Sequence, residues 1–249
     1  MVTERTRRTR WVAGSAVALA VLFAGAATVA SARDDGADHH ATTTAPRTPA
    51  ADSADAGFAQ DMAVHHQQAV EMSFIVRDRT RDEDVRRLAY DIANTQANQR
   101  GMLLGWLDLW ELPKVAAGQE PMAWMAGGAG EASGAGGHEG HDMGDMDGME
   151  GMSGHGDGYQ AHDGSLMPGM ATRTELGRLG KASGKQAEIL YLQLMTDHHK
   201  GGIDMARGCA RLCTVKVEKR LAQGMVEAQQ SELDAMAGML AERGSAPRT

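Results

Sequence analysis

The sequence predicts an all-α protein: a ferritin-like four-helix bundle made of two repeated αα-hairpins that a long disordered crossover joins. Apolar residues recur at helical spacing in two stretches of the 249-residue chain, and no long alternation typical of β-strands occurs. The second stretch repeats the first at a constant offset of 133 residues. Two such hairpins can bury each other's apolar faces, which favours one bundle over two separate domains.

The repeat centres on a motif that combines an aromatic residue, two methionines and two adjacent histidines. Its first copy comprises Phe58, Met62, His65, His66 and Met72, and its second copy comprises Tyr191, Met195, His198, His199 and Met205. The same offset relates Gln96 to Gln229, Gln99 to Glu232 and Leu107 to Leu240. At 100° per residue most motif residues share one stripe of a helix, with the second histidine on its flank. The small residues Ala69 and Gly202 leave room there for close approach or for an ion.

Composition divides the chain into segments of different character. Residues 1–32 have a basic start, an uncharged stretch over 11–30 and the cleavage pattern Ala30-Ser31-Ala32, which predicts a removed signal peptide. The alternative is an uncleaved membrane anchor. The other predicted segments are a disordered tether (33–56), a first hairpin (57–112), a Gly/Met/His-rich linker (113–166), a second hairpin (167–243) and a tail (244–249).

Helix boundaries follow from breaks in the apolar pattern. Helices are expected at about 57–79 and 83–111, then as a short helix ending at Gly180, a long helix to about Leu212 and a last helix to about Arg243. Thr80 or Asp82 is expected to cap the second helix. Ser183 and Gln186 have the spacing of a capping box before the long helix.

Charge and motif content exclude several functions. The formal charge is −8 and becomes −11 without residues 1–32, which argues against a nucleic-acid partner. Two cysteines exclude a four-thiolate zinc site. The chain lacks a Gly-x-Ser-x-Gly elbow, a phosphate-binding glycine loop and a His-Glu-x-x-His motif, so we expect no enzyme. It also lacks the Glu-x-x-His pairs of di-iron bundles.

The doubled motif predicts a metal site. Imidazole suits copper, zinc, nickel and iron, whereas thioether selects Cu(I), so the combination favours copper over zinc. The predicted ligands are Met62, His65, His66, Met72, Met195, His198, His199 and Met205. The alternative is that the methionines fill the core and the histidines form ordinary buried hydrogen bonds.

A second set of potential ligands lies in the acidic linker and near the end of the long helix. In the linker it comprises His138, His141, Met143, Met146, Met149, Met152, His155 and His162. Exposed thioethers bury no apolar surface there, so their abundance favours copper capture, the alternative being a solvated linker. Cys209 and Cys213 have three open interpretations: a disulfide, two further Cu(I) ligands, or two buried apolar residues.

The doubled Met-x2-His-His-x2-small-x2-Met motif, the downstream Gln and Met167-Pro-Gly-Met170 resemble the secreted family catalogued as domain of unknown function 305. The resemblance covers about 57–112 and 167–243. It implies a ferritin-like bundle and, since some members are associated with copper, a site at the eight motif residues. The Lys200-Gly201-Gly202 sequence departs slightly from the commoner small-residue pattern.

The sequence therefore predicts an extracytoplasmic copper-binding protein: a buffer, chaperone or resistance factor. Its expected partners are a metal ion and a protein that donates or accepts copper, with a membrane contacted only through an uncleaved signal segment. The alternative is a metal-free structural or protein-interaction bundle. A metal-dependent redox enzyme is the weaker third interpretation.

Overall fold

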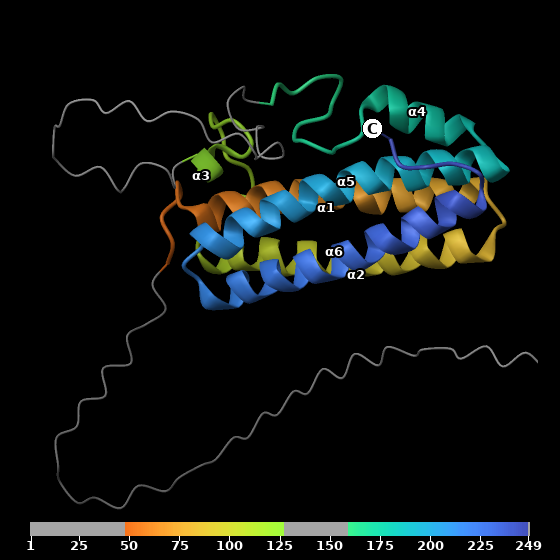
Figure 1. Cartoon of the computed structure of the whole chain (residues 1–249). Coiled ribbons are helices and arrows are strands. Elements are labelled where there is room, and N and C mark those ends of the chain that lie inside the picture. The colour runs from red at the N-terminus through yellow and green to blue at the C-terminus, as the bar shows by residue number, and fades with distance from the viewer. Residues whose placement is uncertain (1–47, 127–158, 249) are drawn as a thin grey trace, which may run out of the picture. The chain divides into compact units, whose positions relative to one another are not determined.

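The computed structural model describes residues 48–126 and 159–248 (Figure 1). Six helices occur in these ranges: α1 (Ala54–Arg79), α2 (Glu83–Leu109), α3 (Ala123–Ala126), α4 (Arg173–Lys181), α5 (Gly184–Leu212) and α6 (Lys216–Glu242). The extended structure in the same residues is limited to one isolated bridge between His162 and Ser165. The all-α fold expected from the sequence is confirmed.

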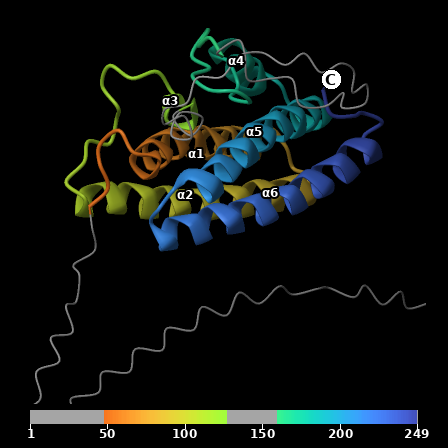
Figure 2. The ribbon, with the colours of Figure 1, turned by 60° about the vertical axis from the view of Figure 1, so that its left-hand side comes forward.

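Four long helices form the bundle, as two antiparallel hairpins. Helix α1 pairs with α2 and α5 pairs with α6, while the two hairpins meet chiefly through α1 and α5 (Figures 1 and 2). The short helices α3 and α4 both contact α1 and α5. None of the helices in the described residues is both long and apolar enough to cross a membrane.

Several helix ends differ from the expected ones. Helix α1 begins at Ala54, inside the expected tether, because the Ser53 hydroxyl accepts a hydrogen bond from the Ala56 backbone N–H at 3.2 Å. Asp82 caps α2 by accepting from the Val85 N–H at 2.9 Å. The expected capping box at Ser183 is wrong, since this side chain makes no cap hydrogen bond. A complete capping box instead begins α4, between Thr172 and Glu175.

The first part of the predicted linker packs on the bundle. Trp124 on α3 is buried and meets the Phe58 ring edge-on, with the centroids 5.9 Å apart. Its indole N–H donates to the Asp61 carboxylate at 2.9 Å, and the Met122 backbone N–H donates to the same oxygen at 2.7 Å. Residues 113–126 are therefore an integral part of the folded unit.

Several sequence-based expectations lie outside the described residues. They are the signal peptide over 1–32, most of the tether, and seven linker residues: His138, His141, Met143, Met146, Met149, Met152 and His155.

Two buried carboxylates fix the ends of the bundle. Asp55 in the first turn of α1 accepts from the backbone N–H groups of Thr214 and Val215, at 2.8 and 2.7 Å, and from the Thr214 hydroxyl. It thereby holds the turn between α5 and α6 against α1. Its equivalent in the repeat is Glu188, which accepts from the Thr80 hydroxyl and from Arg243 at the opposite end.

The apolar core consists of two clusters, one toward each end of the bundle. One contains Phe58, Met62, Leu103, Leu107, Met205, Cys209 and Met225, and the other contains Met72, Ile92, Tyr191, Leu192, Met195, Met236 and Leu240. Met62 lies with Met205, and Met72 with Met195, so α1 and α5 are antiparallel. The two histidine pairs lie between these clusters along both helices.

Candidate metal centre

Four buried histidines gather at the middle of the bundle because the antiparallel packing of α1 and α5 brings the two motif copies together. The rings of His65 and His198 are stacked, with centroids 3.6 Å apart and planes inclined by 29°. His66 and His199 flank this pair, with centroids 6.5 and 6.3 Å from their sequence neighbours. All four side chains are fully buried. The two motif copies therefore share one region of the core.

The flanking histidines are oriented by equivalent residues of the neighbouring helices. His66 Nε2 lies 2.9 Å from Gln99 Oε1 on α2, and His199 Nε2 lies 2.6 Å from Glu232 Oε2 on α6. Each of these oxygens accepts a hydrogen bond, so Nε2 carries the proton in both rings. In the neutral form of a ring protonated in this way, the lone pair is on Nδ1.

These four rings leave buried nitrogen atoms without partners. His198 donates from Nε2 to the backbone carbonyl oxygen of His65 at 3.0 Å, which leaves its lone pair on Nδ1 as well. The nitrogens without a hydrogen-bond partner are Nδ1 and Nε2 of His65 and Nδ1 of His66, His198 and His199. A buried polar atom without a partner costs about 1–3 kcal/mol. A ligand that pairs with these nitrogen atoms would remove this cost for the four rings.

Burial keeps the histidines in the form that ligates metals. It lowers the pKa of His66 to about 3, and His199 adds to the effect although the hydrogen bond to Gln99 opposes it. Burial also places the pKa values of His65 and His198 well below the usual value of 6.5, assisted by the neighbouring imidazoles. These three rings are neutral at neutral pH, and a neutral imidazole has a lone pair to give.

Two glutamines complete the polar region. Gln96 and Gln229, which are equivalent in the repeat, are both buried, and the amide oxygen of each has no hydrogen-bond partner. A Cβ atom added to Gly202 would lie 2.6 Å from the Gln229 amide oxygen and 3.2 Å from the His65 ring. The room expected at Gly202 is real, and in this structure these two side chains occupy it.

The imidazole nitrogens do not converge on one point. Among the described residues, the one set of three His, Cys, Asp or Glu ligand atoms within 4.8 Å of one another is that of Cys209, Cys213 and Glu218. The stacked rings of His65 and His198 lie face to face. A single ion held by three of the four histidines therefore requires at least one ring to rotate.

The predicted methionine ligands are all fully buried in the apolar clusters. Met62 and Met205 lie in the cluster on one side of the histidines, and Met72 and Met195 lie in the cluster on the other side. This placement is that of core residues adjoining a polar layer. The structure brings the histidines together but assigns the thioethers to the two flanking layers.

The remaining predicted ligands are elsewhere. Cys209 and Cys213 form a disulfide, so in this state neither sulfur is a thiolate ligand. His162 is exposed and packs against Tyr159, with ring centroids 5.8 Å apart.

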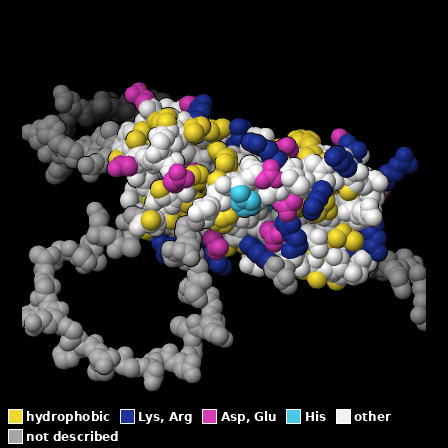
Figure 3. Space-filling view, turned by 90° about the horizontal axis from the view of Figure 1, so that it is seen from above, with side chains coloured by type: hydrophobic (Ala, Val, Ile, Leu, Met, Phe, Trp, Pro, Cys, Tyr) yellow, Lys and Arg dark blue, Asp and Glu magenta, His cyan; other side chains and the backbone are white. Residues whose placement is uncertain are grey.

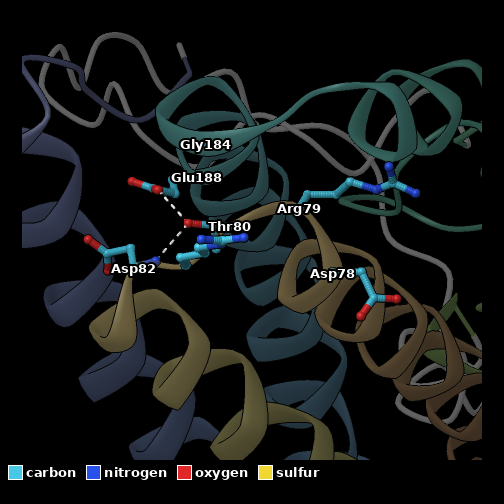
Figure 4. Close-up of a pocket in the computed structure, with 7 residues that line it drawn as sticks. Asp78, Arg79, Thr80, Asp82, Gly184 and Glu188 are labelled. Atoms are coloured by element: carbon cyan, nitrogen blue, oxygen red, sulfur yellow. Dashed lines mark hydrogen bonds between the residues drawn. The ribbon is translucent and has the colours of Figure 1, made fainter.

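In the part of the chain that the structure describes, no surface group brings three His, Cys, Asp or Glu ligand atoms within 4.8 Å of one another. The face in Figure 3 mixes acidic, basic and apolar side chains. A pocket at the turn between α1 and α2 is lined by Asp78, Arg79, Thr80, Arg81, Asp82, Gly184 and Glu188 (Figure 4). There the Thr80 hydroxyl donates to Glu188 at 2.5 Å and accepts from the Asp82 N–H at 3.0 Å. These contacts join the hairpins and include no histidine or methionine.

Sequence reasoning missed the roles of several polar residues. It found that Gln99 and Glu232 are equivalent, but the signal for their role, a separation of 33 residues from His66 and from His199, is clear only once both hairpins are folded. The buried carboxylate of Glu218 gave no signal, since a glutamate in the first turn of a helix is usually exposed.

The fold and the site define a four-helix protein whose two hairpins enclose a shared histidine cluster. The sequence pattern of the family described as domain of unknown function (DUF305) matches residues 55–240, and the chain belongs to this family. The resemblance stated from the motif is confirmed.

The chain is also similar to several solved structures. A DUF305 protein from Streptomyces coelicolor, classed as secreted, is 56% identical, with a TM-score of 0.64 and coverage of 80% of this chain and 99% of that one. A DUF305 fragment from Deinococcus radiodurans is 24% identical, with a TM-score of 0.53 and coverage of 76% and 96%. CopM in its Cu(II)-bound form is 18% identical, with a TM-score of 0.43 and coverage of 74% and 93%. No curated protein matches the chain.

Proposed function

We propose that this protein binds copper outside the cytoplasm, as a buffer, chaperone or resistance factor, and that the four-histidine cluster is its ordered site. The observation that carries the proposal is the set of buried imidazoles with unpartnered nitrogens between the hairpins. Burying such atoms without a partner destabilises a metal-free bundle. Donating their lone pairs to a metal ion removes that cost.

Gln99 and Glu232 have the role of orienting the outer ligands. By accepting from Nε2 they hold His66 and His199 with Nδ1 as the donor atom. An imidazole whose N–H donates a hydrogen bond to a carboxylate gives its lone pair to a metal ion more strongly than one whose N–H donates to an amide oxygen. His199, paired with Glu232, is therefore the stronger of the two outer ligands.

Copper suits the chemistry of the region better than zinc does. Imidazole binds both metals, but the four methionines of the motif lie in the layers that adjoin the histidines, and thioethers favour Cu(I). The chain has a formal charge of −8, which attracts cations to its surface. The Met/His-rich linker adds a second, weaker copper-binding segment to the proposal, and a protein that donates or accepts copper remains its proposed partner.

The proposed role is binding, without catalysis. The pocket at the α1–α2 turn includes Thr80 and Glu188, whose hydrogen bond joins the hairpins. A metal-free structural bundle is the competing function. Its specific support is the stacked arrangement of His65 and His198, in which three imidazole nitrogens do not meet.

The test is an anaerobic titration with Cu(I) against a competing chelator, repeated with Cu(II). His66→Gln and His199→Gln are the informative variants, because a glutamine amide can donate to Gln99 or Glu232 as Nε2 does but has no imidazole lone pair. We expect the double variant to lose the tightest copper equivalent. His162→Gln is the matched control at an exposed histidine and should bind copper as the unchanged protein does.

The contribution of the linker is measured by removing residues 127–158. Residues 113–126 stay in the protein because Trp124 packs on α1. Tight binding that survives this deletion supports the histidine cluster. If the deletion abolishes binding and the double glutamine variant does not, the bundle is a scaffold for a copper-binding linker and the proposed ordered site is wrong.

A further inference from the structure

The second hairpin departs from the first at three positions that come together in space. Cys209 and Cys213 lie at the end of α5, and Glu218 lies in the first turn of α6. The residues at the equivalent positions of the first hairpin are Val76, Thr80 and Val85. Two sulfurs and one carboxylate thus replace two valines and a threonine, all in one corner of the second half.

The potential ligand atoms of these three residues lie close together. The two sulfurs and a Glu218 carboxylate oxygen all lie within 4.8 Å of one another. Glu218 is fully buried, and neither of its oxygens has a hydrogen-bond partner. Asp55 lies beside it, but that carboxylate already accepts hydrogen bonds from the turn before α6. In the disulfide-bonded protein, Glu218 is therefore a buried acid that lies beside two sulfurs and the Asp55 carboxylate.

The stabilisation expected from the disulfide is modest. It joins residues four apart on one helix, and the loop that it closes is very short. In the chain-entropy account, the stabilisation by a disulfide grows with the length of the closed loop, so this bond stabilises the protein less than one that closes a long loop. The first hairpin makes the same turn without it.

We infer that Cys209, Cys213 and Glu218 form a redox-gated zinc site, distinct from the histidine cluster, which opens when a protein dithiol reduces the disulfide. The reductant supplies two electrons and two protons and becomes a disulfide. The bond between the two sulfurs breaks, and each cysteine becomes a thiol. Binding of Zn²⁺ then releases one proton from each thiol and one from Glu218.

The donor set identifies the cation. Two thiolates and a carboxylate, with a fourth position for water, match the ligands that Zn²⁺ takes in proteins. Cu(I) prefers sulfur ligands to carboxylate oxygens. Burial, together with the nearby Asp55 carboxylate, raises the pKa of Glu218 to about 9. Cys213 directly follows the last residue of α5, at the turn to α6.

The test compares zinc binding by the disulfide-bonded and the reduced protein, with the reduced sample prepared anaerobically. The difference between the two titrations cancels any zinc on the histidines. We expect the reduced protein to bind one further Zn²⁺ and the bound ion to protect both thiols from alkylation. The protection is measured on the unaltered protein and does not depend on any variant folding.

Two variants locate the ion. Cys209→Val with Cys213→Thr introduces the residues of the first hairpin and should abolish the redox-dependent equivalent. Glu218→Gln keeps the size of the side chain and should weaken binding about tenfold or more. Equal zinc binding in both redox states, unchanged affinity in Glu218→Gln, or a reduced pair that binds Cu(I) and leaves Zn²⁺ in solution would each overturn the inference.

Discussion

The rings of His65 and His198 stack at the middle of the bundle with centroids 3.6 Å apart, although 133 residues separate them in the chain. Each is the equivalent of the other in the repeat. Equivalent residues of the two hairpins therefore meet at the middle of the bundle. His66 with Gln99 and His199 with Glu232 are the corresponding pairs on either side.

The departure from symmetry at Glu232 gives the first prediction. Glu232→Gln makes the second half of the cluster like the first, where Gln99 already holds a histidine. The protein should fold normally, and its copper affinity should fall about 10- to 100-fold because His199 loses its carboxylate partner. Chelator competition measures the change. The reciprocal Gln99→Glu variant should bind copper more tightly, and unchanged affinity in both variants contradicts the proposed ligand roles.

The second prediction concerns stability at acid pH. His65, His66 and His198 have lowered pKa values in the folded protein, so the unfolded chain binds more protons below about pH 6.5. Their contribution to the free energy of unfolding is complete above that pH. It is lost as the pH falls toward 3, at up to about 1.4 kcal/mol per pH unit for each ring. The contribution of Glu218 changes with pH in the opposite direction, since it is lost as the pH rises from about 4.5 to 9. The three histidines outweigh it below pH 6.5.

Urea denaturation of the metal-free protein at pH 7, 6 and 5 measures this dependence. The free energy of unfolding should decrease at each acid step. His66→Gln should show a shallower decrease, because the titrating ring is absent. A flat profile in the unchanged protein is incompatible with neutral buried histidines.

A third prediction tests the contact between the hairpins at Asp55. Asp55→Ala removes the acceptor for two backbone N–H groups and one hydroxyl, so it should lower the free energy of unfolding by about 2–4 kcal/mol. Asp52→Asn is the control, since Asp52 is exposed two residues before α1 begins. Similar unfolding midpoints for both variants would show that Asp55 does not hold the turn.

The fourth prediction concerns two helical glycines. A Cβ atom at Gly57 would lie 2.5 Å from the Trp124 ring, so Gly57→Ala should displace α3 and cost about 1–3 kcal/mol. Gly105 has nothing within 4 Å of its added Cβ, and Gly105→Ala should stabilise α2 by about 0.5–1 kcal/mol. The midpoint of thermal unfolding should fall in Gly57→Ala and rise in Gly105→Ala. Tryptophan fluorescence should change only in the first variant.

The long helices could be predicted from the sequence because charged breaks and capping residues interrupt the apolar pattern. Asp82, for example, lies at the expected start of α2. The repeat also predicted that His65 corresponds to His198. The sequence could not show whether the two motif copies meet, since that depends on the direction in which α1 and α5 pack. The antiparallel arrangement joins the histidines and places Met62 in one cluster with Met205 and Met72 in the other with Met195.

The residues that sequence reasoning missed are mostly single polar groups in the core. Asp55 and Glu218 look like the acidic residues that commonly occupy the first turn of a helix at the surface. Their burial results from contacts with the other hairpin, which no local pattern encodes. Ser183 shows the converse, because its spacing to Gln186 matches a capping box that does not form.

X-ray absorption spectroscopy of the copper-loaded protein lacking residues 127–158 tests the central claim most directly. Imidazole ligands have a distinctive multiple-scattering pattern, which identifies the atoms around copper without a substitution. If the four-histidine cluster binds copper, we expect at least two imidazole ligands per tightly bound ion, and fewer in the His66→Gln and His199→Gln double variant. A copper environment of sulfur or oxygen atoms without imidazole would contradict it.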